Sequence, residues 1–196
     1  MKKPPPTVAV IAGLDPTGGA GLAADIHAVT DAGAHPLPLM TANTIQGQGI
    51  ATRFEVVEPV FLSDQLNAVF QNHKPGAIKL GMLGSPEAVQ ALVSALEKWS
   101  VMAPLIMDPV RSASSGGDLV GVGMRKELLN LLQYTVLITP NRDELSWLTG
   151  CEVSTESEIE DAVVFLGEHG CGSILVKGGH SKGAPVDTLY TQGIPV

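Results

Sequence analysis

The sequence is short of aromatic residues, of charges and of cysteine. Aromatic side chains make up 4% and charged side chains 16% of its 196 residues, and Cys151 and Cys171 are the only cysteines. Neither cysteine lies in a C-x-x-C or metal-binding spacing, and the five histidines share no such spacing, so neither a disulfide framework nor a zinc site is predicted. A chain of this size needs no disulfide, which makes the reducing cytoplasm the expected compartment.

Long apolar runs are absent too. No stretch approaches the roughly 20 apolar residues of a membrane span, so we expect no membrane partner. The run at 8–14 follows two lysines, but it is short for a signal peptide and lacks an A-x-A-like cleavage site.

Lysine and arginine are outnumbered by acidic residues. The chain has 12 Lys and Arg against 20 Asp and Glu, a formal net charge of −8 at pH 7, and no basic cluster. Nucleic acids bind to basic surfaces, so this balance argues against a nucleic-acid partner and favours a small molecule. With 44% hydrophobic residues, residues 1–196 have the composition of one globular domain.

Glycine, in contrast, gathers where the first apolar run ends. Residues 13–21 read GLDPTGGAG, and a helical pattern follows. Such a strand-turn-helix junction collects unpaired backbone N–H groups, and its glycines let a flat or anionic ligand approach them. Residues 19–24 also fit the dinucleotide fingerprint G-x-G-x-x-A, although three residues separate this turn from the strand. A tight turn without any ligand is the third interpretation.

Strand and helix patterns alternate along the rest of the chain. After a first strand that stops at Gly13, we predict strands at 36–44, 77–80, 104–107, 136–139, 173–177 and 186–190, and helices at 22–32, 58–72, 86–99, 124–132, 144–148 and 157–169. Residues 46–57 are expected to form a small flap over the sheet. This alternation is typical of an α/β fold with a mainly parallel sheet and helices on both faces.

Polar motifs follow the predicted strands, at the edge where ligands bind in such sheets. They are 13–15 (GLD), Gln46, 81–84 (GMLG), 108–110 (DPV), 139–144 (TPNRDE) and 177–180 (KGGH). Because the carboxyl ends of parallel strands share one edge, we expect these motifs to surround a single site.

Two carboxylates stand at neighbouring strand ends in this pattern. Asp108 and Glu144 could bind Mg²⁺, which uses one or two carboxylates when it is bound to substrate phosphates. A turn Asp before Pro109 and a Glu favoured by a helix dipole explain the same residues without a metal. Asn141 is better explained as the N-cap of the helix that contains Glu144.

Other polar and adaptable side chains of these motifs suit a phosphate and an aromatic ring. Lys177, followed by Gly178 and Gly179, offers a point charge beside exposed backbone N–H groups, as a phosphate site requires. Gln46 can form paired hydrogen bonds with an aminopyrimidine edge, although a Gln in a loop is more commonly a surface residue without a ligand. Met82, in a glycine-flanked loop, can cover an aromatic ring, although filling a core is its commoner role.

Five of these motifs, in their order and spacing, closely resemble those of the hydroxymethylpyrimidine and phosphomethylpyrimidine kinases of thiamine biosynthesis, a branch of the ribokinase-like fold. The matching motifs are 13–21 with Ala24 and Asp25, 81–83, 108–110, 139–141 with Glu144, and 177–180. By that resemblance, the residues around the pyrimidine would be Gly13, Ala20, Asp25, Thr44, Gln46, Met82 and Val110. Those near Mg²⁺ and the phosphates would be Asp108 and Glu144, and those on the nucleotide side Asn141, Lys177 and Gly179.

The resemblance also implies an activity. It is the ATP-dependent phosphorylation of 4-amino-5-hydroxymethyl-2-methylpyrimidine and of its monophosphate, by a homodimer that uses ATP as co-substrate with Mg²⁺. Pyridoxal or pyridoxine kinase is the alternative within the same fold. A pyrimidine-binding or subunit-interaction module with weak or no catalysis is the alternative from another class.

The sequence departs from the family pattern at three places. The loop after the second predicted strand carries both Gln46 and Gln48, so either could bind the ring, and Arg111 stands near the position where the family has a lysine. The family's Gly-Thr-Gly-Cys turn, which supplies the anion hole, would come beyond Val196. The catalytic residue is therefore unassigned, and we expect residues 1–196 to be a ribokinase-like kinase domain lacking its C-terminal part.

Overall fold

A nine-stranded sheet organises the residues that the structure, a computed structural model, describes: 4–47, 50–111, 122–178, 185–191 and 193–195. Its strands are β1 (Thr7–Leu14), β2 (His35–Gly47), β3 (Ile50–Val56), β4 (Ala77–Leu80), β5 (Leu105–Met107), β6 (Thr135–Ile138), β7 (Ser173–Val176), β8 (Thr188–Thr191) and β9 (Ile194–Pro195). They lie in the order β3-β2-β1-β4-β5-β6-β7-β8-β9. The six central strands are parallel, whereas β3 at one edge and β8 and β9 at the other are antiparallel to their neighbours.

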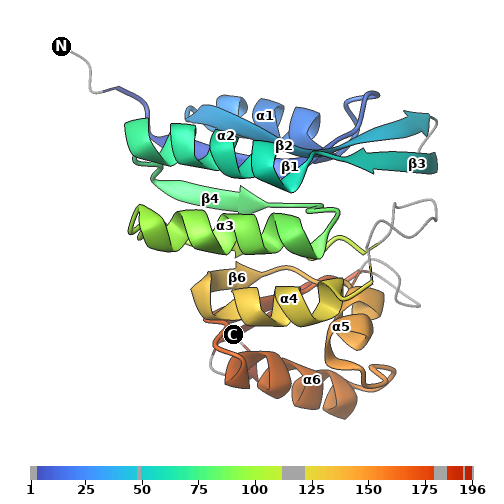
Figure 1. The fold of residues 1–196 in the computed structure, drawn as a ribbon. Coiled ribbons are helices and arrows are strands. Elements are labelled where there is room, and N and C mark those ends of the chain that lie inside the picture. Colours follow the sequence, from blue (N-terminus) through green and yellow to red (C-terminus); the bar gives the residue numbers. More distant parts are fainter. Residues whose placement is uncertain (1–3, 48–49, 112–121, 179–184, 192, 196) are drawn as a thin grey trace.

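The helices form a thick layer on one face of the sheet and a thin one on the other. They are α1 (Gly21–Asp31), α2 (Pro59–Asn72), α3 (Pro86–Lys98), α4 (Met124–Leu131), α5 (Arg142–Thr149) and α6 (Glu156–Glu168), with a 3₁₀ turn (Leu132–Tyr134) after α4. Helices α2 to α6 pack against one another in chain order, and Figure 1 shows α2, α3 and α4 side by side along the sheet. Among the described helices, none has the length and apolarity that crossing a membrane requires.

Side chains of β1 alternate between the two helix layers. Ala9 and Ile11 belong to the main core beneath α2 and α3, whereas Val10 and Ala12 pack with Leu22 of α1. All four strand residues are fully buried, which explains why the run reads as continuously apolar rather than alternating. The prediction of a mainly parallel sheet with helices on both faces is therefore confirmed.

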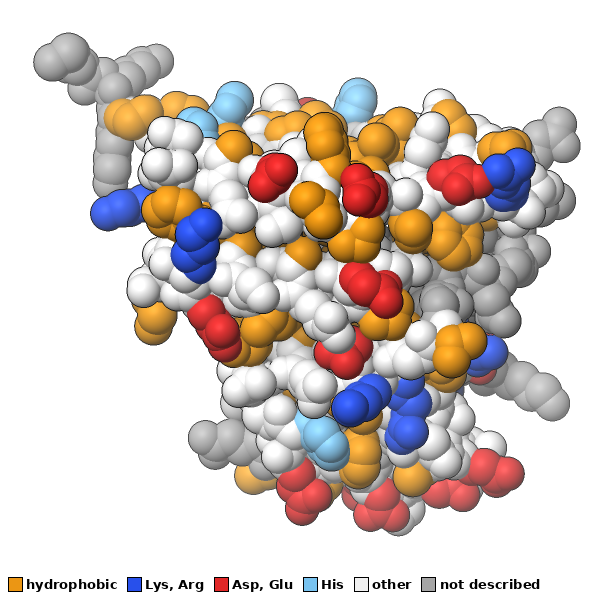
Figure 2. Space-filling model, in the orientation of Figure 1, with side chains coloured by type: hydrophobic (Ala, Val, Ile, Leu, Met, Phe, Trp, Pro, Cys, Tyr) orange, Lys and Arg blue, Asp and Glu red, His pale blue; other side chains and the backbone are white. Residues whose placement is uncertain are grey.

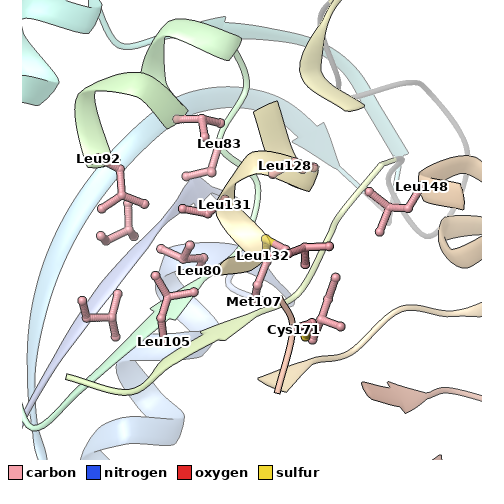
Figure 3. Packing of buried hydrophobic residues seen from close by; sticks show 14 of the residues in the cluster. Leu80, Leu83, Leu92, Leu105, Met107, Leu128, Leu131, Leu132, Leu148 and Cys171 are labelled. Carbon is pink, nitrogen blue, oxygen red and sulfur yellow. The ribbon is translucent and has the colours of Figure 1, made fainter. Parts of the chain in front are cut away.

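The main core holds the central strands in place. Figure 3 shows Leu80 of β4 and Met107 of β5 close to Leu131 and Leu132 at the end of α4. These side chains are fully buried, and burying one of this size stabilises the fold by roughly 1.5–3 kcal/mol. Because Leu80 and Met107 end their strands, their packing also fixes the positions of the residues that follow them.

Most predicted bounds lie within one or two residues of the observed ones, and three differences have an identifiable physical reason. Strand β2 continues past Thr44 to Gly47, because residues 42–47 pair with β3 to form the flap as a hairpin. Helix α5 begins at Arg142, two residues earlier than predicted, because Asn141 caps it. Strand β9 was not predicted, since two residues carry no periodic pattern. Gln48 and Gly179 lie outside the described residues.

Candidate functional site

The turn between β1 and α1 brings two stretches of backbone into close contact. Gly21 has a φ of +57°, and a Cβ atom there would lie 2.4 Å from the carbonyl oxygen of Gly13. Asp15 is only 4% exposed, and its Oδ1 accepts hydrogen bonds of 2.8 Å from the N–H and the hydroxyl of Thr17. Ala20, the N-cap of α1, offers the first helical turn no side-chain acceptor. This turn therefore leaves backbone donors available beside the end of β1.

Met82 packs against the same end of β1. A Cβ atom on Gly13 would lie 2.9 Å from the sulfur of Met82, so the glycine makes room for this side chain. Met82 is buried with Ala42 and Ala51, and Val110 packs against this small cluster. Three residues expected around the ring, namely Gly13, Met82 and Val110, are thus brought together by three different strand ends.

Thr44 and Gln46 lie on β2, beside this cluster. The buried hydroxyl of Thr44 donates a hydrogen bond of 2.9 Å to the carbonyl oxygen of Leu14, and it lies 3.4 Å from Oε1 of Gln46. Gln46 lies at a shift in the register between β2 and β3. Such an irregularity redirects a side chain, and the Gln46 side chain remains partly exposed.

Asp25 has a partner that the sequence analysis did not identify. Its Oδ2 accepts a hydrogen bond of 2.5 Å from Nζ of Lys79, a residue of β4 that is 54 positions away in the chain. Both side chains are partly buried, between α1 and the sheet.

The other half of the site lies at the ends of β5, β6 and β7. Nζ of Lys177 lies 2.9 Å from Oδ1 of Asp108 and 3.7 Å from Oε2 of Glu144. The hydroxyl of Thr139 lies 3.4 Å from the same oxygen of Asp108. The structure thus brings the two predicted carboxylates together, and it puts an ammonium group between them.

Asn141 holds Glu144 in place through a capping box at the start of α5. Oδ1 of Asn141 accepts a hydrogen bond from the backbone N–H of Glu144, and Oε2 of Glu144 accepts one from the backbone N–H of Asn141, both of 2.8 Å. The predicted N-cap is therefore confirmed. Glu144 has a structural role as well, because its carboxylate completes the capping box at the start of α5. The backbone N–H of Lys177 donates to Pro140, which ties β7 to this helix start.

Burial governs the electrostatics of this acidic pair. It raises the pKa of Glu144 above its usual range, although the hydrogen bond from the backbone of Asn141 and the charge of Lys177 lower that pKa. Lys177 places a positive charge beside both carboxylates, which offsets part of the cost of burying Glu144.

The donor set suits a Mg²⁺ ion that arrives with phosphate, because such an ion takes only one or two protein carboxylates. Asp108 and Glu144 together present two such carboxylates at neighbouring strand ends. Within the part of the chain that the structure describes, no three His, Cys, Asp or Glu side chains form a dedicated metal cage.

Comparison with known proteins identifies the family. Residues 15–195 match the family described as phosphomethylpyrimidine kinase. The chain is 31% identical over 192 residues to the hydroxymethylpyrimidine/phosphomethylpyrimidine kinase of Staphylococcus aureus strain MRSA252, with 96% of this chain and 69% of that protein covered. It is 36% identical over 188 residues to the thiamine biosynthesis bifunctional protein ThiED of Geobacter sulfurreducens, with 94% of this chain covered. The chain spans only 38% of the length of that relative.

Solved structures share the fold. The phosphomethylpyrimidine kinase of Clostridium difficile 630 matches with a TM-score of 0.86 and 31% identity, over 97% of this chain and 82% of that one. A pyridoxal kinase of Staphylococcus aureus in complex with ADP matches with a TM-score of 0.84 and 22% identity, over 97% of this chain and 69% of that one, and this likeness concerns the fold alone. The expected ribokinase-like fold is confirmed, and the chain belongs to the phosphomethylpyrimidine kinase family.

Proposed function

We propose that this protein transfers the γ-phosphoryl group of ATP to the hydroxymethyl oxygen of 4-amino-5-hydroxymethyl-2-methylpyrimidine, and then a second one to the resulting monophosphate. The observation that carries this proposal is the family match over residues 15–195. In the first step the hydroxymethyl oxygen bonds to the γ-phosphorus and loses its proton. In the second step an anionic oxygen of the monophosphate bonds to the γ-phosphorus, and in both steps the bond from the γ-phosphorus to the ADP oxygen breaks. The relative in Staphylococcus aureus, named for both steps, supports a site that serves both.

In this proposal the ring lies at the ends of β1, β2 and β4. It would be surrounded by Gly13, Ala20, Asp25, Thr44, Gln46, Met82 and Val110. Met82 would cover one face of the ring, since it is already held against the glycine-lined end of β1. Gln46 would pair its amide with the aminopyrimidine edge, since its side chain is partly exposed beside Thr44.

The phosphates would lie at the ends of β5 to β7. Asp108 and Glu144 would hold Mg²⁺, which neutralises phosphate charge when it is bound. Lys177 and Asn141 would bind the nucleotide, because Lys177 already lies within reach of both carboxylates and can turn toward phosphate oxygens. Gly179 belongs to the same proposal, but it lies outside the described residues.

Substitution of Gln46 tests where the ring binds. Gln46→Ala should weaken binding of the hydroxymethylpyrimidine by about 1–3 kcal/mol, roughly 5- to 150-fold, because ring polar groups would lose their partners. Gln46→Leu should bind no better, since it restores only shape, and the affinity for ATP should barely change. Calorimetric titration measures all of these affinities. Unchanged affinity for the pyrimidine would mean that Gln48 binds the ring or that the ring is not the ligand.

Competition binding separates this proposal from pyridoxal kinase, whose solved examples share the fold. Tighter binding of pyridoxal than of the hydroxymethylpyrimidine would reverse the choice of substrate. Turnover separates it from a binding module without catalysis. Consumption of ATP that depends on added pyrimidine, at about 1–100 s⁻¹, is expected of a kinase.

We also propose a cytoplasmic homodimer. Val56, Val60 and Phe61 expose apolar side chains at the end of β3 and the start of α2, and Figure 2 shows hydrophobic side chains over this part of the surface. Such a patch favours association between subunits. A single monomeric species in sedimentation at micromolar concentration would argue against the dimer.

A further inference from the structure

Lys79 occupies a position where a parallel sheet normally has an apolar residue. Strand β4 lies in the middle of the sheet between β1 and β5. Ile78 and Leu80, on either side of Lys79, are fully buried in the main core, so Lys79 faces the layer that contains α1. Its side chain is only 28% exposed. Central strands of parallel sheets are buried on both faces, and a lysine there has a desolvation cost that needs compensation.

Asp25 of α1 provides that compensation, and the chain leaves room for the pair. Oδ2 of Asp25 accepts the hydrogen bond from Nζ of Lys79. A Cβ atom on Gly81 would lie 3.1 Å from this Nζ and 3.1 Å from Cβ of Ala12, so glycine keeps the space beside the ammonium open.

The pair borders the place where the ring is proposed to bind. Gly81 follows β4 and lies against Ala12, and the next residue, Met82, lies against Gly13 in the same way. Oδ2 of Asp25 is held by Lys79, whereas Oδ1 makes no hydrogen bond to any described residue. The carboxylate is thus anchored by one oxygen, and the other is available as an acceptor.

We propose that Lys79 is a positioning residue for the substrate. By holding Oδ2 of Asp25, it fixes the orientation of the carboxylate, so that Oδ1 accepts a hydrogen bond from a hydroxyl or amino group of the ring substrate. A charge-assisted anchor of this kind restricts the acceptor to one orientation before the ligand arrives. The inference rests on the proposed function, because it requires a ring ligand beside Gly13 and Met82.

A double-mutant cycle tests the proposal. Lys79→Met, Asp25→Asn and the double variant are titrated calorimetrically with the hydroxymethylpyrimidine and, separately, with ATP and Mg²⁺. Lys74→Met is the matched control, because Lys74 is exposed before the other end of β4. Each single variant at the pair should bind the pyrimidine about tenfold more weakly. The double variant should bind it no more weakly than Asp25→Asn alone, because Lys79 acts through Asp25. The affinity for ATP should stay within about twofold in every variant.

The outcomes distinguish this role from a structural ion pair. A lower melting temperature of Lys79→Met with unchanged pyrimidine affinity would overturn the positioning role and leave the proposed function intact. Lys79→Gln keeps a hydrogen-bond donor but no charge, and it replaces Lys79→Met in the test if that variant does not fold. Unchanged pyrimidine affinity of Lys79→Gln would also overturn the positioning role. If the unaltered protein binds no hydroxymethylpyrimidine, the proposed function fails and the positioning role fails with it.

Discussion

Replacing Lys177 with methionine should destabilise the protein, because the carboxylates of Asp108 and Glu144 would lose the positive charge beside them. The ammonium lies 2.9 Å from Asp108 and 3.7 Å from Glu144. With an effective dielectric constant of about 20, Coulomb's law gives attractions of about 6 and 4.5 kcal/mol for these distances. Methionine keeps most of the length and apolar stem of the lysine, so the change removes mainly the charge.

Solvent reduces this gross attraction considerably. The side chains of Lys177 and Asp108 are 35% and 32% exposed, so water screens their pair, whereas Glu144 is buried. Exposed pairs contribute up to about 1 kcal/mol, and removing one partner of a buried pair costs about 3–5 kcal/mol. We therefore expect a loss of about 2 kcal/mol. In a protein of this size, that corresponds to a melting temperature lower by roughly 4–8 °C.

Calorimetric melting in a chelating buffer provides the measurement. Lys126→Met, at an exposed position on α4, is the control and should melt within about 1 °C of the unaltered protein. Adding Asp108→Asn to Lys177→Met should restore part of the loss, because it removes one of the uncompensated charges. Millimolar Mg²⁺ should also stabilise Lys177→Met more than the unaltered protein. Equal melting temperatures for Lys177→Met and Lys126→Met would refute the reasoning.

Buried and crowded positions elsewhere allow three more tests. Burial raises the pKa of the Cys171 thiol from its usual 9.0 to about 11, so at pH 8 it should react with iodoacetamide at least about 100-fold more slowly than the exposed Cys151, which mass spectrometry can follow. Because the pKa of this thiol is higher in the folded state, its contribution to stability is complete below pH 9 and is lost between about pH 9 and 11. The free energy of unfolding, measured by urea denaturation, should therefore fall less over this pH range in Cys171→Ala than in the unaltered protein. Gly21→Ala should cost at least about 3 kcal/mol, because its Cβ would meet the oxygen of Gly13, whereas Gly33→Ala, also at positive φ but in open space, should cost about 1 kcal/mol. Equal melting temperatures of these two variants would show that the turn relaxes.

Much of the fold could be predicted because each element carries its own local pattern. The apolar run of β1 indicated a strand buried on both faces, and Pro86 indicated the start of α3. The capping box of Asn141 and Glu144 was also readable, since its spacing is local, although only half of it was predicted. The length of β2 was not readable, because Gly47 suggests a loop and only pairing with β3 makes this segment a strand.

The site was predictable in its location and not in its contacts. Motifs at the ends of parallel strands must lie near one another, which is why Asp108 and Lys177 could be grouped from sequence. Their hydrogen bond joins residues 69 positions apart, and no local pattern shows that Lys177 would lie between two carboxylates. Lys79 was overlooked for a related reason. In a four-residue strand, a single lysine between Ile78 and Leu80 reads as an interruption of the core rather than as a partner of Asp25.

The contact between Gly21 and Gly13 limits how the chain can vary in length. Because backbone touches backbone there, α1 cannot slide along β1 to absorb an inserted or deleted residue. A slip by one residue would advance the helix by about 1.5 Å and rotate it by about 100°, which would turn Asp25 away from Lys79. Residues 14–20 can therefore exchange side chains far more readily than they can change in number. A library of insertions and deletions across this turn should tolerate almost none, while substitutions at its exposed positions survive.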